Sequence, residues 1–108
     1  MTNEEVFKKS IQHYGPKAQI DLAIEEMSEL TKALLKHRRA SMGQGDPQEK
    51  AKDVAEEIAD VRIMLDQLEM IFDNKVQVRE WIEKKVNRQI QRMEGEDVHG
   101  HTDFEETH

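Results

Sequence analysis

Two pairs of acidic residues have the spacing of a metal site. Glu26 and Glu29 stand three residues apart, as do Glu57 and Asp60. Residues at this separation share one face of an α-helix, so each pair can present two carboxylates together. Helical periodicity places Glu26, Glu57 and Asp60 within the apolar arcs of their segments, and Glu29 at the edge of one. An unpartnered ionised acid is costly there, so we expect a cation beside these groups.

The two acid pairs also stand symmetrically about a break in the chain. Their midpoints, 27.5 and 58.5, lie 16 residues before and 15 residues after 43.5, the centre of the loop expected at 41–46. In an antiparallel helical hairpin about that loop, the four carboxylates meet at nearly one height. An all-oxygen group suits Mg²⁺ or Mn²⁺. The plainer interpretation is that these are solvated acids, since the chain has 23 acidic residues.

A known family carries similar motifs. The run Glu25-Glu26-Met27-Ser28-Glu29, followed by Glu57-Ile58-Ala59-Asp60, resembles the Glu-Glu-x-x-Glu and Glu-x-x-Asp motifs of the MazG-like nucleotide pyrophosphohydrolases. The likeness covers about residues 10–93 and is nearest to the short phage and bacterial members, which are related to dimeric dUTPases. The resemblance implies that Glu26, Glu29, Glu57 and Asp60 bind Mg²⁺, with Mn²⁺ as an alternative. It also makes Glu25 and Glu26 the candidate catalytic residues, with Glu25 completing the ligand shell or orienting a water.

The same resemblance implies a reaction. It is the hydrolysis of nucleoside triphosphates, which we expect to be deoxynucleotides, between the α and β phosphates to give a monophosphate and pyrophosphate. On the last predicted helix, Lys85 and Arg88 lie beside Trp81 and resemble the basic residues that contact phosphates in this superfamily. A solvated charged face is the plainer interpretation of these residues. The resemblance further implies a homodimer or homotetramer with nucleotide near the subunit boundary.

Composition limits the remaining function classes. A chain of 108 residues is about one domain and buries a modest core, which favours self-association. The net charge of -7 argues against binding to a nucleic-acid polymer. Without cysteine there is no disulfide, zinc-thiolate site or cysteine nucleophile. No long apolar run or signal-peptide pattern occurs, so we expect a cytoplasmic protein with no membrane partner.

The periodicity of the apolar residues, together with the capping and helix-breaking residues between the periodic segments, predicts an all-α antiparallel bundle of about four helices. We expect this domain over residues 1–94, and an acidic, disordered tail over 95–108. The expected helices begin at a Thr2 capping box and end at Gly15, then run over 17–40, 47–72 and 75–93, with Gly95 closing the last. The third helix is expected to begin at an Asp46 cap answered by Glu49, and its core stripe to comprise Val54, Ile58, Val61, Leu65 and Leu68.

Three other interpretations remain open. A non-catalytic helical module would bind a partner through its apolar stripes and would not need four acids at one level, so divalent-ion titration separates it from the enzyme. A di-iron carboxylate bundle requires Glu-x-x-His pairs, which Glu29 and Asp60 do not supply. Within the MazG-like superfamily, the enzyme could instead remove one particular nucleotide, such as dUTP.

Overall fold

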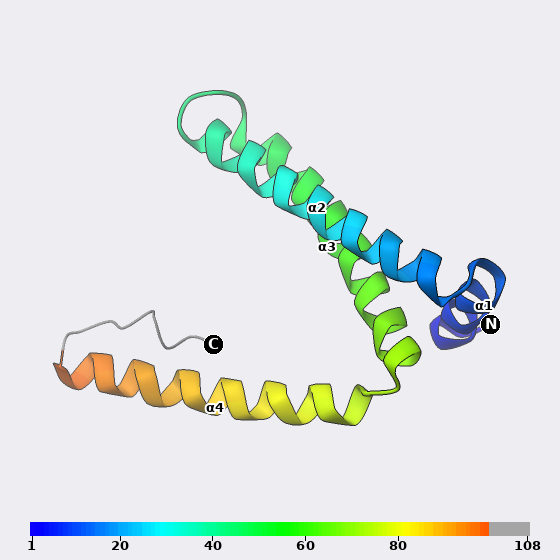
Figure 1. Ribbon diagram of the computed structural model, residues 1–108. Coiled ribbons are helices and arrows are strands. Elements are labelled where there is room, and N and C mark those ends of the chain that lie inside the picture. The colour runs from blue at the N-terminus through cyan, green and yellow to red at the C-terminus, as the bar shows by residue number, and fades with distance from the viewer. Residues whose placement is uncertain (100–108) are drawn as a thin grey trace. The chain divides into compact units, whose positions relative to one another are not determined.

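The computed structural model describes the backbone of residues 1–99 and the side chains of residues 1–95. This part of the chain contains helices and no strand, which confirms the expected all-α class. The four helices are α1 (Asn3–Tyr14), α2 (Pro16–Ser41), α3 (Pro47–Phe72) and α4 (Lys75–His99) (Figure 1). They fall into two compact units, of which the first spans Met1–Asp73 and the second begins at Asn74.

The first three helices begin where local chemistry favours a start. At Thr2 the hydroxyl accepts a hydrogen bond from the Glu5 amide over 3.1 Å, while the Glu5 carboxylate accepts one from the Thr2 amide over 3.4 Å. Pro16 occupies the first turn of α2, where a missing N–H costs nothing. Asp46 caps α3 by accepting from the Gln48 amide over 3.0 Å. The expected answering bond from Glu49 is absent among the hydrogen bonds of the described residues.

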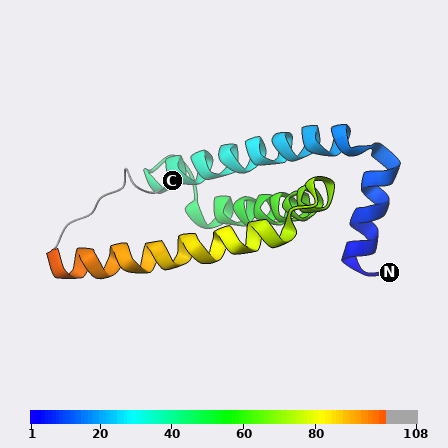
Figure 2. The ribbon, with the colours of Figure 1, turned by 60° about the horizontal axis from the view of Figure 1, so that its bottom comes forward.

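Helices α2 and α3 form the antiparallel hairpin that the sequence predicts. Gly43 and Gly45, with φ of +93° and +136°, turn the chain in the connecting loop, a region of φ that favours glycine. Helix α1 contacts both helices and runs across the end of the hairpin away from the loop (Figure 2). Side chains on the facing sides of α2 and α3 therefore meet along the hairpin.

The hairpin buries a narrower strip than the sequence predicts. Of the expected α3 stripe, Val61 is buried, whereas Ile58 and Leu65 are exposed. One helix packed against one other covers only part of a wide apolar arc, which explains the difference. The buried apolar side chains of the first unit are Ala23, Ala33, Ala40, Val61 and Met64.

Helix α4 continues past the predicted end. The expectation that Gly95 closes the helix is wrong, because α4 runs to His99. A glycine inside a helix costs only about 1 kcal/mol relative to alanine, so it weakens a helix without necessarily ending it. The remainder of the predicted tail, residues 100–108, lies outside the described residues. Within residues 1–99, no helix combines the length and apolar character needed to cross a membrane.

Candidate metal centre

Three carboxylates from the two hairpin helices converge. Glu26 on α2, together with Glu57 and Asp60 on α3, offer ligand oxygens that all lie within 4.8 Å of one another. All three side chains are half-buried. Their meeting follows from the symmetric spacing about the loop, since helices of equal rise place residues at equal distances from a turn side by side.

The fourth expected carboxylate stays outside this group. Glu29 lies one turn beyond Glu26 on α2 and pairs with Lys32, whose ammonium nitrogen is 3.3 Å from Glu29 Oε1. The Glu29 charge nevertheless contributes to raising the pKa of Glu57. The structure thus assembles three of the four predicted ligands and places the fourth near enough to interact electrostatically.

Crowding of these acids changes their proton affinity. Burial raises the pKa of Glu26, and the charge of Asp60, a hydrogen bond with Asp60 and the charge of Glu57 raise it further. Burial likewise raises the pKa of Glu57, followed by the charges of Asp60 and Glu29. Each shift means that the negative form is disfavoured in the folded chain, so a bound cation or a proton would stabilise the group.

The charges of this acid cluster, Glu26, Glu57 and Asp60, are not balanced by any ion pair among residues 1–95. Among the described residues, none of the three carboxylates forms an ion pair with Lys or Arg. Glu57 Oε2 is buried and has no hydrogen-bond partner. Oxygens bound to one Mg²⁺ at about 2.1 Å lie about 3 to 4 Å apart, so small side-chain movements would bring the three into a common ligand shell. The donor set and the unpartnered oxygen fit a hard divalent cation.

Glu25, the other candidate catalytic residue, is exposed beside the cluster. Its charge contributes to raising the pKa of its neighbour Glu26. An exposed carboxylate at this position can accept a proton from water without first losing its solvation. The geometry therefore separates the two candidates: Glu26 lies within the acid cluster, and Glu25 lies at its border with solvent.

The predicted substrate-binding residues belong to the other unit. Trp81, Lys85 and Arg88 are all exposed on α4. The cation that lies over the Trp81 ring is Lys84, with its ammonium nitrogen 5.2 Å from the ring centroid. Contact of these residues with phosphate remains a prediction.

The α2–α3 interface contains two buried polar residues that the sequence alone did not single out. Gln19 and Gln67 are buried between α2 and α3, and Gln19 Nε2 donates a hydrogen bond to Gln67 Oε1 over 2.7 Å. The available signal was their spacing, since each lies seven residues from an acid of the cluster. Lys32 was also overlooked, although it follows Glu29 by the three residues that favour a pair on one helix face.

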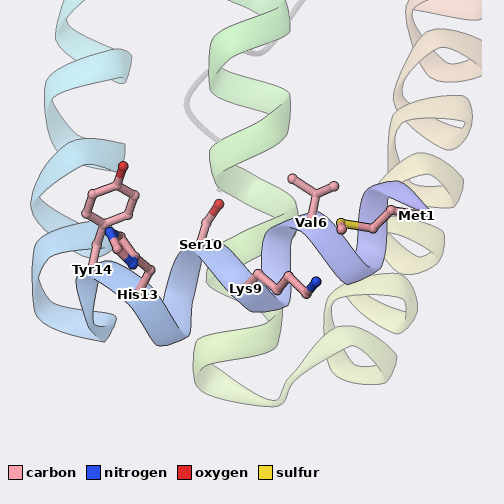
Figure 3. A pocket seen from close by; sticks show the side chains of 6 residues that line it. All are labelled: Met1, Val6, Lys9, Ser10, His13 and Tyr14. Carbon is pink, nitrogen blue, oxygen red and sulfur yellow. The ribbon is translucent and has the colours of Figure 1, made fainter.

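A separate hollow lies along α1. It has a volume of about 370 Å³, and Figure 3 shows its lining side chains on α1 and on Met1 just before it, with the rings of His13 and Tyr14 together at one end. These rings meet edge to face, with centroids 4.6 Å apart. The hollow is open and the described residues that line it include no carboxylate, so they do not form a site for a divalent cation. Its lining residues are Met1, Val6, Lys9, Ser10, His13 and Tyr14.

Comparisons of the chain with models of protein families, with curated proteins and with solved structures found no match. The acid cluster is therefore the feature on which a functional assignment depends. Chemically, three carboxylates and one divalent cation can draw negative charge from a phosphate group and position a water beside it.

Proposed function

We propose that the chain is a Mg²⁺-dependent nucleoside triphosphate pyrophosphohydrolase that cleaves between the α and β phosphates. The observation that carries the proposal is the convergence of Glu26, Glu57 and Asp60 with no compensating Lys or Arg in the part of the chain that the structure describes. The resemblance of residues 25–29 and 57–60 to the MazG-like motifs supports the same chemistry. The products are a nucleoside monophosphate and pyrophosphate, and deoxynucleoside triphosphates are the expected substrates.

In this mechanism Glu26, Glu57 and Asp60 would hold the ion, and Glu29 would be a further ligand once it is released from Lys32. Bound Mg²⁺ supplies charge neutralisation at the phosphate oxygens, and Mn²⁺ can supply the same. Glu25 at the edge of the cluster orients the attacking water and accepts its proton. The water oxygen bonds to the α phosphorus, the bond to the bridging oxygen breaks, and pyrophosphate leaves with that oxygen.

Cations are needed for the triphosphate beyond the metal. Lys85 and Arg88 on α4 are proposed to contact phosphate, with Trp81 presenting an aromatic face to the nucleotide. Lys32 is a further candidate, because it is exposed and already lies beside Glu29. A cation within reach of the acids can neutralise charge on the leaving pyrophosphate.

We propose that the working form is a homodimer or homotetramer in the cytoplasm. The buried apolar core of one chain consists mainly of alanines, whereas many large apolar side chains remain exposed on α2, α3 and α4. Exposed apolar area of this extent is typical of surfaces that associate. Examples are Ile24, Leu34, Ile63, Leu65, Trp81, Ile82, Val86 and Ile90.

The second candidate function is a non-catalytic interaction module. The exposed apolar face of α4, which includes Ile82, Val86 and Ile90, favours it, because such a helix can occupy a groove on a partner. This function needs no metal. A protein that binds partners through α4 would retain that binding when Glu57 is neutralised.

The experiment is a turnover assay on purified protein with a panel of ribo- and deoxynucleoside triphosphates and Mg²⁺, identifying pyrophosphate or phosphate as the product. Glu57→Gln should abolish pyrophosphate release. The matched control is Glu56→Gln, which removes the same charge from the adjacent, exposed position and should leave turnover nearly unchanged. Absence of pyrophosphate with every nucleotide, or full activity in Glu57→Gln, would overturn the proposal.

A further inference from the structure

The α2–α3 interface contains one buried polar pair. Gln19 and Gln67 are each 4% exposed, and the amide of Gln19 donates to the carbonyl oxygen of Gln67 over 2.7 Å. They are the buried polar side chains of the described part of the chain. A single buried amide pair in a helix interface is specific in direction and position, unlike apolar contacts.

On both helices, the glutamine of the amide pair is separated from an acid of the cluster by the same number of residues. Gln19 precedes Glu26 by seven residues, and Gln67 follows Asp60 by seven residues. Seven residues are almost two helical turns, so each glutamine lies on the same face as its acid and about 10.5 Å along the axis. The hydrogen bond between the glutamines therefore requires the same axial register and rotation at which Glu26 faces Asp60.

The rest of the interface specifies register weakly. Its buried apolar side chains are three alanines on α2 (Ala23, Ala33 and Ala40) and Val61 and Met64 on α3, and no large side chain in the described residues is fully buried. The alanine face of α2 offers no large side chain that interlocks with α3, so it resists sliding of one helix along the other only weakly. The 41–46 loop constrains the far end, but Glu26, Glu57 and Asp60 lie 13.5 to 17.5 residues from its centre at 43.5, about 20 to 26 Å along the helices.

We propose that Gln19 and Gln67 are positioning residues for the metal centre. Their hydrogen bond holds α2 and α3 in the register that brings Glu26 to Glu57 and Asp60. A slipped or rotated interface would leave two amides unpaired away from water, which disfavours those arrangements. The acid cluster thus lies between two constraints on the helix register, the 41–46 loop toward one end of the hairpin and the amide pair toward the other. This inference depends on the proposed function only in that the cluster binds a divalent cation.

The test compares Mn²⁺ affinity with thermal stability. Gln19→Met and Gln67→Met each leave one buried amide unpaired and should lower the melting temperature. The double variant Gln19→Met/Gln67→Met replaces both amides with apolar chains of similar size and should recover most of that stability. Its Mn²⁺ affinity, measured by calorimetry, should stay about tenfold weaker than that of the unsubstituted chain, as expected when groups that orient metal ligands are lost.

Ala33→Gly is the matched control. Ala33 lies seven residues from Glu26 on the side opposite Gln19, and it is buried in the same interface. Glycine at this helical position lowers stability while leaving the amide pair intact. Mn²⁺ affinity in this variant should remain within about twofold of the original.

The outcomes separate the two proposals. Failure of the unsubstituted chain to bind Mn²⁺ would overturn the metal centre and with it the positioning role. Normal Mn²⁺ binding by the unsubstituted chain and by the double variant would overturn the positioning role alone. Equal loss of affinity in Ala33→Gly and the double variant would show that affinity follows general stability, which also contradicts the positioning role.

Discussion

The Lys32 ammonium donates a hydrogen bond to the Glu29 carboxylate over 3.3 Å, one turn along α2. This pair borders the acid cluster, because the charge of Glu29 reaches Glu57 and contributes to raising its pKa. The fourth acid of the predicted ligand set is thus held by a cation of its own helix. In the proposed mechanism, metal binding would compete with Lys32 for the Glu29 carboxylate.

Removing that competitor should strengthen metal binding. Lys32→Gln is expected to tighten Mn²⁺ binding about two- to fivefold, the range expected for loss of an exposed ion pair. Calorimetric titration with Mn²⁺ measures the change. Lys36→Gln is the control, because Lys36 is an exposed lysine one further turn along α2. An equal gain in both variants would show a general charge effect rather than release of Glu29.

Neutralising Glu57 should raise the stability of the metal-free protein. In Glu57→Gln the half-buried charge disappears, and the repulsion from Asp60 and Glu29 disappears with it. The melting temperature without metal is expected to rise, while the further rise produced by Mg²⁺ in the unsubstituted chain should be lost. Thermal scans with Mg²⁺ and with chelator measure both effects. Glu56→Gln should retain the response to Mg²⁺, and a Mg²⁺ response that survives in Glu57→Gln contradicts the ligand assignment.

The raised pKa values of Glu26 and Glu57 give the metal-free protein a defined pH dependence. Because both lie above the ordinary value of 4.5, the folded state binds these protons more tightly than the unfolded state. The associated stability is present below pH 4.5 and is lost as the pH rises through the raised values. The difference in melting temperature between Glu57→Gln and the unsubstituted chain should therefore grow with pH above this point. A difference that is constant with pH contradicts a raised pKa.

Metal affinity should rise with pH, whereas the stability of the metal-free protein should fall. A cation competes with protons for the carboxylates of the acid cluster, so Mg²⁺ or Mn²⁺ binds more tightly as the pH rises through the same range. Calorimetry at a series of pH values, with buffers of different ionisation enthalpy, measures proton release on binding. Binding without proton release at pH values just above 4.5 would contradict the coupling.

Substitutions of Glu25 and Glu26 should have different effects on metal affinity and on turnover. Glu26→Gln is expected to lose Mn²⁺ affinity and turnover together, because Glu26 lies within the acid cluster. Glu25→Gln should keep Mn²⁺ affinity and lower kcat by about 10² to 10⁴, the usual range for a general base. Steady-state kinetics with calorimetry makes the comparison. Unchanged kcat in Glu25→Gln would remove this residue from the mechanism.

Association should depend on the apolar face of α4. Val86→Glu places a charge among exposed apolar side chains and should shift the protein toward monomers, as measured by light scattering on a sizing column. Glu83→Gln, at an exposed polar position of the same helix, should leave the assembly unchanged. A monomeric unsubstituted chain at micromolar concentration would contradict the proposed oligomer.

Local chemistry in the sequence was sufficient to predict most of the secondary structure. Capping at Thr2 and Asp46, proline at the first turn, and glycines in the connections act within a few residues, so their effects can be inferred without the fold. The end of α4 was the exception. Gly95 was expected to end the helix, but a single glycine disfavours a helix only slightly, and α4 continues to His99. The pairing of Glu26 with Glu57 and Asp60 was also predictable, since equal spacing from one loop determines height in a hairpin.

Only the tertiary structure decided which side chains the helices cover and which acids meet. Whether Ile58 or Met64 is buried depends on the rotation of α3 against α2, and a wide apolar arc allows several rotations. The structure likewise placed Glu29 with Lys32 instead of in the acid cluster, because the pair forms within one turn of α2. It also revealed the Gln19–Gln67 bond, which joins residues 48 positions apart. Such contacts depend on how two helical surfaces fit, and periodicity along one chain segment carries no information about the surface opposite.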